Sequence, residues 1–353
     1  PVRFWRGAPL FLLIYRFGMT SNWGSIMKNS SIGLLFATLI CSSSYAADIF
    51  NGTLVDAHSQ KGKLISSEEV SEHINKSDVD LTLLSFRGGH RKLPNTFLAI
   101  DELTKNKVRF LLPTKLGGHH KGAPLPKVMK KLKRFQNKAT DNDIEYVGFA
   151  EILVQHAPHN NKYLKWDGVN YDLYNEGISA IINFIIKDSK PVILHVELND
   201  YEKDSKKILS QLIELSEKHP NTNFLLIHMG QVEFSEAELI LNSTKNIHFI
   251  TSLSDNETQN RVKKAKKGDS QTGFINLFDR DDSLQQKWVD LMNAHPKRFV
   301  LALDRVFAGS WLKYKDKIHL WRKALAKLDK RSSVLIACGN AHEYFKLEIE
   351  FII

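Results

Sequence analysis

Short apolar runs alternate with segments of helical periodicity along most of the chain, and this rhythm constrains the fold more than any other feature. Strands that alternate with amphipathic helices are typical of parallel sheets. The predicted strands are Thr53–Ala57, Leu81–Phe86, Val108–Leu112, Glu145–Ala150, Pro191–Val196, Asn223–Ile227, Asn246–Thr251 and Arg298–Leu303. Eight such units match the size of a TIM barrel, so we predict the α/β class and a single (β/α)8 barrel.

Amphipathic segments predict a helix after each strand, and a Ser66…Glu69 capping box opens the first. The predicted helices are Ser66–Lys76, Asn95–Lys105, Lys127–Lys138, Leu173–Lys187, Asp204–His219, Ser235–Ser243, Ser283–His295 and Lys315–Asp329. An open doubly wound sheet shares this alternation. It normally has a glycine-rich turn after its first strand, and here that turn reads His58-Ser59-Gln60-Lys61.

The chain shows no Pro/Ser-rich linker and no abrupt change of composition, which favours one domain over residues 47–353. The longest irregular stretch, Leu253–Asp282, follows the seventh predicted strand. In a barrel this stretch would lie over the catalytic mouth as a lid or specificity loop.

Residues 1–46 are expected to be upstream sequence followed by a secretory signal peptide. The signal would begin at Met27, with basic Lys28, an apolar stretch at Ile32–Cys41 and cleavage after Ala46. A short membrane anchor is the alternative, but ten apolar residues are too few to span ~30 Å of hydrocarbon. We therefore expect a periplasmic or secreted protein with no stable membrane span after the signal is removed.

Removal of residues 1–46 would take away four basic residues and no acid, which lowers the net charge from +10 to +6. The basic run Lys127–Lys138 has helical spacing and no aromatic stacking motif, so a solvated helix face is favoured over a nucleic-acid site. Cys338 would be the only cysteine left, which excludes an internal disulfide, a cysteine-ligated zinc site and a CxxC redox motif.

Ionisable residues fall at the carboxyl ends of the predicted strands, which converge on one face of a barrel. They are Asp56 and His58 on the first strand, Glu151 on the fourth, His195 and Glu197 on the fifth, His228 on the sixth and Asp304 on the eighth. One such histidine is usually a core residue, and one such aspartate usually caps a helix. Their joint occurrence predicts a site for a divalent metal that activates water.

Six segments, from Leu54 to Leu347, resemble the amidohydrolase superfamily, in its branch of amidohydrolase-related (amidohydrolase 2 type) hydrolases and decarboxylases. The segments are LVDAHSQ, KPVILHVEL, HPNTNFLLIHMG, NIHFITS, HPKRFVLALD and CGNAHEYFKL. The resemblance implies a metal-dependent hydrolase that acts on an amide, ester or lactone bond of a small substrate. A non-oxidative decarboxylase on the same scaffold is the enzymatic alternative.

The resemblance also implies roles for individual residues. His58, His195 and Asp304 look like ligands of one zinc ion rather than two, and Asp304 also looks like the group that moves a proton. His228 would polarise the substrate carbonyl or hold the water. Glu151 would be a ligand or would support a ligand histidine, and Asp56 and Glu197 would support ligands from outside the metal shell.

One departure from the family pattern bears on function. The second histidine of the first-strand pair is Gln60 here, and an amide oxygen binds zinc more weakly than imidazole does. Gln60 could still be a ligand, or the chain could be a catalytically inactive barrel that binds a ligand. We favour a retained metal site, because the other positions match.

Other residues bear on the substrate. Arg87 follows the second strand and Lys115 the third, which predicts an anionic small molecule; a plain basic loop is the alternative. The loop histidines His119, His120, His156 and His159 are suggestive of a site, but adventitious metal binding or solvent exposure explains them at least as well.

Overall fold

The computed structural model describes residues 49–114, 125–160, 165–265 and 271–348, all within one compact unit, Ala47–Ile353. The predicted upstream segment and signal peptide lie outside the described residues. Each predicted strand is present as a strand. These strands are β1 (Val55–Lys61), β2 (Leu81–Phe86), β3 (Val108–Leu112), β4 (Tyr146–Phe149), β10 (Val192–His195), β11 (Phe224–Leu226), β12 (Ile247–Ile250) and β13 (Phe299–Val300).

The strands pair in parallel within two sheets, with orders β1-β2-β3-β4 and β13-β12-β11-β10-β5. Strand β5 (Ile152–Leu153) follows β4 after only two residues and so connects the sheets at one edge. At the other edge the Ala57 N–H donates to Leu301 O (3.0 Å) and the Asp304 N–H to His58 O (2.8 Å). These bonds arrange the eight strands in cyclic order, as the predicted barrel requires.

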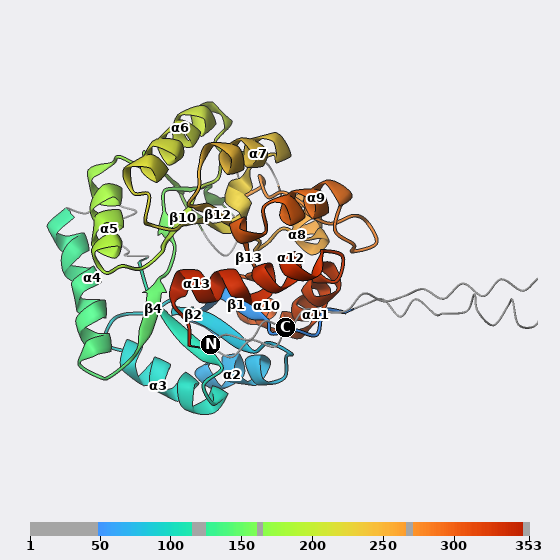
Figure 1. Cartoon of the computed structure of the whole chain (residues 1–353). Helices are drawn as coiled ribbons and strands as arrows, with labels where there is room; N and C mark the ends of the chain where they lie inside the picture. Colours follow the sequence, from blue (N-terminus) through green and yellow to red (C-terminus); the bar gives the residue numbers. More distant parts are fainter. Residues whose placement is uncertain (1–48, 115–124, 161–164, 266–270, 349–353) are drawn as a thin grey trace, which may run out of the picture. The chain divides into compact units, whose positions relative to one another are not determined.

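The predicted helices are all present and lie outside the strands (Figure 1). They are α2 (Ser67–Asn75), α3 (Leu93–Thr104), α4 (Leu125–Thr140), α5 (Glu176–Lys187), α6 (Glu202–Lys218), α7 (Phe234–Ser243), α9 (Gln286–Ala294) and α11 (Tyr314–Leu325). The described residues also form α8 (Asn256–Val262), α10 (Ala308–Trp311), α12 (Lys330–Val334) and α13 (Asn340–Phe345). The capping box of Ser66 and Glu69 is confirmed. No helix among the described residues has the length and apolar character needed to cross a membrane.

Strand β1 continues to Lys61, four residues beyond the predicted end at Ala57. The last residues of β1 are polar, so a search for apolar runs does not recognise them as part of a strand. They are nevertheless buried, and Gln60 is only 1% exposed. They are buried because the strand pairs with β2 on one side and with the segment after β13 on the other. The extension carries His58 and Gln60 into the centre of the strand ring.

Asp56 holds β1 against the eighth strand and α11. Its carboxylate accepts hydrogen bonds from Leu303 N (2.9 Å), Ser59 Oγ (2.6 Å) and Tyr314 Oη (3.1 Å). Burial raises the pKa of Asp56, and these donors lower it again only in part. Because its oxygens bind groups of the scaffold, Asp56 acts as a structural latch in the ring.

Asp56→Ala should lower the free energy of unfolding by about 2–3 kcal/mol, because it leaves a buried backbone N–H and a buried phenol without their acceptor. Urea denaturation would measure the change, with the exposed acid Asp78→Ala as the matched control. Equal stability of the two variants would contradict the latch.

Candidate metal centre

Side chains from five parts of the ring meet in one buried cluster. His58 and Gln60 share one face of β1 because alternate residues of a strand point the same way. Glu151 lies between β4 and β5, His195 ends β10, His228 follows β11, and Asp304 follows β13; each of these six side chains is buried.

His195 lies between two carboxylates. Its Nδ1 is 2.7 Å from Glu151 Oε2, and its Nε2 is 2.7 Å from Glu197 Oε1. Burial disfavours a charged imidazole, but the charges and hydrogen bonds of Glu151 and Glu197 outweigh it and raise the pKa of His195 to about 9. His195 thus links the carboxylates of Glu151 and Glu197.

Asp304 lies between the other two histidines. His58 Nδ1 is 3.3 Å from Asp304 Oδ1, and His228 Nε2 is 3.7 Å from Asp304 Oδ2. Burial opposes ionisation of Asp304, but the contact with His58 outweighs it and lowers the pKa of Asp304. Burial, and then the neighbouring His195, lower the pKa of His228 to about 3, so its ring is neutral at neutral pH.

Gln60 joins two of the carboxylates through its amide nitrogen. Nε2 donates to Glu151 Oε1 (3.1 Å) and to Asp304 Oδ1 (2.9 Å), while Oε1 accepts from Arg87 Nε (2.8 Å). This orientation is fixed by its partners, since guanidinium offers only donors and carboxylate only acceptors. The oxygen that the ligand prediction requires therefore points to Arg87, and the amide nitrogen faces the carboxylates.

The backbone at His228 is strained. His228, Met229, Gly230 and Gln231 all have left-handed φ values, of 55°, 56°, 64° and 51°. Left-handed conformations cost non-glycine residues about 1 kcal/mol or more each. Asp304 adopts the same conformation, with φ 46°. Such strain is typical of functional sites, where the surrounding structure holds side chains in one position.

The cluster also contains residues that the sequence did not assign to it. The His156 ring stacks on His195 at 4.8 Å between centroids, and Phe274 meets the His228 ring edge to face at 5.3 Å. Gln271 donates to Glu197 Oε1, and Ser252 Oγ lies 2.9 Å from His228 Nδ1. Solvent exposure is wrong for His156, which is buried.

The sequence predicts that the stretch Leu253–Asp282 lies over the site, and two of its described residues, Gln271 and Phe274, do contact the cluster. It includes the helix α8, which the prediction of a wholly irregular segment did not anticipate. The position of this stretch after the seventh predicted strand indicated that some of its residues would reach the site, but it did not identify Gln271 and Phe274.

The cluster fits a divalent cation. The ligand atoms of Glu151, His195 and His228 lie within 4.8 Å of one another. His156, His195 and Glu197 form a second such group. Of the two ring nitrogens of buried His58, Nδ1 has only its 3.3 Å contact with Asp304, and Nε2 lacks a partner, which is costly unless another group binds it. Imidazole and carboxylate donors together suit zinc and other first-row metals.

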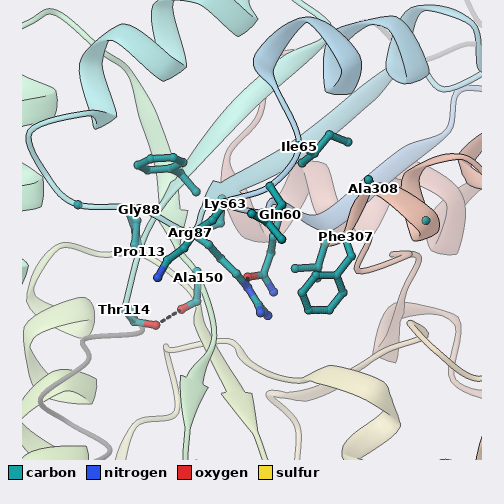
Figure 2. Close-up of a pocket in the computed structure, with 17 residues that line it drawn as sticks. Gln60, Lys63, Ile65, Arg87, Gly88, Pro113, Thr114, Ala150, Phe307 and Ala308 are labelled. Atoms are coloured by element: carbon teal, nitrogen blue, oxygen red, sulfur yellow. Dashed lines mark hydrogen bonds between the residues drawn. The ribbon is translucent and has the colours of Figure 1, made fainter. Parts of the chain in front are cut away.

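A pocket of about 920 Å³ opens beside the cluster and includes Gln60 and Arg87 in its lining (Figure 2). Arg87 thus lies in the lining of this pocket, and its binding of a substrate stays a prediction. The other predicted substrate residue, Lys115, lies outside the described residues, as do His119 and His120.

Searches with family models and among curated proteins match nothing to this chain. Among solved structures, an uncharacterised TIM-barrel protein from Bordetella bronchiseptica has a TM-score of 0.52 and 8% identity, over 83% of this chain and 98% of its own. The chain has the TIM-barrel fold. Both the cyclic order of its strands and its likeness to the Bordetella protein indicate this fold.

Two further solved structures are similar at lower TM-scores. A probable 2-pyrone-4,6-dicarboxylic acid hydrolase from Acinetobacter baumannii has a TM-score of 0.46 and 11% identity, over 84% of this chain and 100% of its own. A mutant organophosphorus hydrolase from Deinococcus radiodurans has 0.47 and 10%, over 85% and 94%.

The pKa of His195 gives a pH prediction for protein treated with a chelator. A histidine whose pKa rises from 6.5 to about 9 on folding stabilises the fold fully below about pH 6.5, and this stabilisation is lost as the pH rises through 9. The free energy of unfolding should fall by on the order of 3 kcal/mol across this window. Urea titrations at several pH values would measure it, and His195→Gln should flatten the curve. Parallel curves for the two proteins would contradict the assignment.

Proposed function

We propose that this TIM barrel is a metal-dependent hydrolase that cleaves an amide, ester or lactone bond of a small substrate. The main support is the buried cluster of His58, Glu151, His195, His228 and Asp304, in which Nε2 of His58 has no hydrogen-bond partner. From the sequence of residues 27–46 we further propose export to the periplasm or the medium.

His58, His195 and Asp304 would hold one zinc ion, with Glu151 as a further ligand or as the group that orients His195. The hydrogen bond between Glu151 and His195 Nδ1 suits either role. A divalent cation bound there would lower the pKa of a water and polarise the scissile carbonyl.

The chain's own residues supply the proton transfer and the charge stabilisation. Asp304 is ionised at neutral pH, since its pKa is lowered, so it can accept a proton from the attacking water and pass it to the leaving group. Neutral His228 has its Nε2 3.7 Å from Asp304, so it can donate a hydrogen bond to the developing oxyanion when that nitrogen carries the proton. Gln60 positions the carboxylates of Glu151 and Asp304 through its two N–H groups.

One observation favours a second candidate, a barrel that binds a ligand without catalysis. The Gln60 amide already bridges Glu151 and Asp304, and His195 already bridges Glu151 and Glu197. The protein itself therefore offsets part of the negative charge that a cation would otherwise balance.

Metal content separates the two candidates. Protein purified without chelator and dialysed against zinc should hold close to one ion per chain by elemental mass spectrometry. His58→Ala and His195→Ala should each lose most of it, because each removes a buried imidazole donor. His319→Ala, which changes an exposed histidine of α11, should keep it. A wild-type protein without zinc, or equal zinc in all variants, would favour the binding barrel.

Activity on a panel of 4-nitrophenyl esters, lactones and amides tests the catalytic step. Asp304→Asn should lower kcat/KM by about 10²–10⁴-fold, the usual contribution of a general acid–base group. Asp290→Asn, an exposed acid of α9, is the matched control. Gln60→His, which restores the histidine of the family pattern, should retain zinc. Indifference of a measured activity to Asp304→Asn would overturn the proton-transfer role.

A further inference from the structure

The pocket beside the cluster is built from the loops that follow the first and eighth strands. Residues 62–65 and 306–309 line it, as do residues 85–89 after the second strand. The two loops are pinned together, because the Gly62 N–H donates to Val306 O (3.1 Å). A Cβ at Gly62 would come within 2.3 Å of the same oxygen, so only glycine permits this approach.

The walls of the pocket are largely apolar. Leu64, Ile65, Phe86, Val306 and Phe307 supply hydrocarbon surface, and no acidic residue is among the described residues that line it. Its volume of about 920 Å³ is typical of sites for small organic molecules. An apolar body of modest size fits such a space, and an anionic group is not repelled from it.

The mouth of the pocket exposes large apolar side chains to solvent. Leu64 is 93% exposed and Phe307 is 61% exposed. Leu98, Leu103 and Leu239 are also exposed, but they lie on outer helices and do not line the pocket. Apolar side chains gathered at the rim of a cavity mark a ligand-binding surface more often than single exposed ones do.

Arg87 gives the pocket a fixed cationic end. Its Nε donates to Gln60 Oε1 (2.8 Å), and its guanidinium lies 5.6 Å from the centre of the Phe307 ring. Figure 2 shows Gln60, Arg87 and Phe307 around the pocket. Among the described residues, Nη1 and Nη2 have no hydrogen-bond partner, which leaves the pair of donors that binds a carboxylate in a bidentate manner.

We propose that this pocket binds an amphiphilic carboxylic acid, with its carboxylate on Arg87 and its apolar body between Leu64, Phe86 and Phe307. The substrate class rests on the proposed function: the enzyme would hydrolyse an ester, lactone or amide of such an acid. Water adds across the C–O or C–N bond; an ester or amide gives the carboxylic acid and an alcohol or amine, and a lactone gives a single hydroxy acid. Gln60 contacts both Arg87 and the catalytic carboxylates, so the acid product forms next to its binding group.

Calorimetric titration with butanoate, hexanoate and octanoate tests this proposal. Affinity should rise about fourfold per CH₂, the gain from burying one methylene. Octan-1-ol should bind about tenfold more weakly than octanoate, and octylammonium more weakly still, because Arg87 attracts only the anion. Equal affinity for butanoate and octanoate, or for octanoate and octylammonium, would overturn the proposal.

Variants assign the two ends of the ligand. Arg87→Met should weaken octanoate at least tenfold and leave octan-1-ol unchanged, whereas the exposed control Arg91→Met should change neither. Phe307→Ser alters a solvent-exposed side chain and should lower the gain in affinity per CH₂ at least by half. The control Leu98→Ser should leave this gain unchanged. Octanoate binding that is unaffected by both Arg87→Met and Phe307→Ser would overturn the assignment.

The titrations are repeated on chelator-treated and on zinc-treated protein, so that this inference and the proposed function fail separately. Octanoate binding that depends on Arg87 in a protein that takes up no zinc would reject the hydrolase and keep the pocket assignment. Zinc uptake without octanoate binding would keep the hydrolase and reject the pocket assignment.

Discussion

The burial of three carboxylates in one place is the constraint on which the rest of this structure depends. Glu151, Glu197 and Asp304 are nearly or fully removed from water. Ionised carboxylates are costly to bury unless charged or hydrogen-bonding partners surround them. His195 supplies two of these contacts and the Gln60 amide another two. The strand ring brings these partners together, and each comes from a different strand.

Gln60 connects the chemistry of the cluster with the pocket beside it. Its amide nitrogen faces the carboxylates, and its oxygen holds Arg87 at the floor of the pocket. A histidine at this position would have no carbonyl oxygen with which to hold a guanidinium. In the function proposed above, Gln60 would therefore support a substrate-binding Arg87 at a position where the amidohydrolase pattern has a histidine.

Hydrophobic period alone predicted all eight strands and their helices, because the core faces of these elements are continuous and apolar. It ended β1 too early, since Gln60 and Lys61 are polar residues that the ring nevertheless buries. The meeting of His58, His195, His228 and Asp304 was predictable from the convergence of strand ends. The role of Asp56 as a latch was not, because its partner Leu303 N lies 247 residues away.

Two features of the site could not be predicted from the sequence for physical reasons. The direction of the Gln60 amide depends on which donors and acceptors surround it, and these come from β2, β4 and the eighth strand. The stacking of His156 on His195 depends on the path of the chain after β5, which carries no periodic signal. Composition and spacing predict which residues are buried. The partners of the Gln60 amide and of the His156 ring are determined only by how the ring of strands brings distant segments together.

The most direct test of the account is anomalous X-ray diffraction at the zinc edge from crystals grown with zinc. The account predicts one strong anomalous peak among the side chains of His58, His195 and Asp304. Diffraction that shows the Gln60 amide between Glu151 and Asp304 but no anomalous peak within the cluster would contradict it.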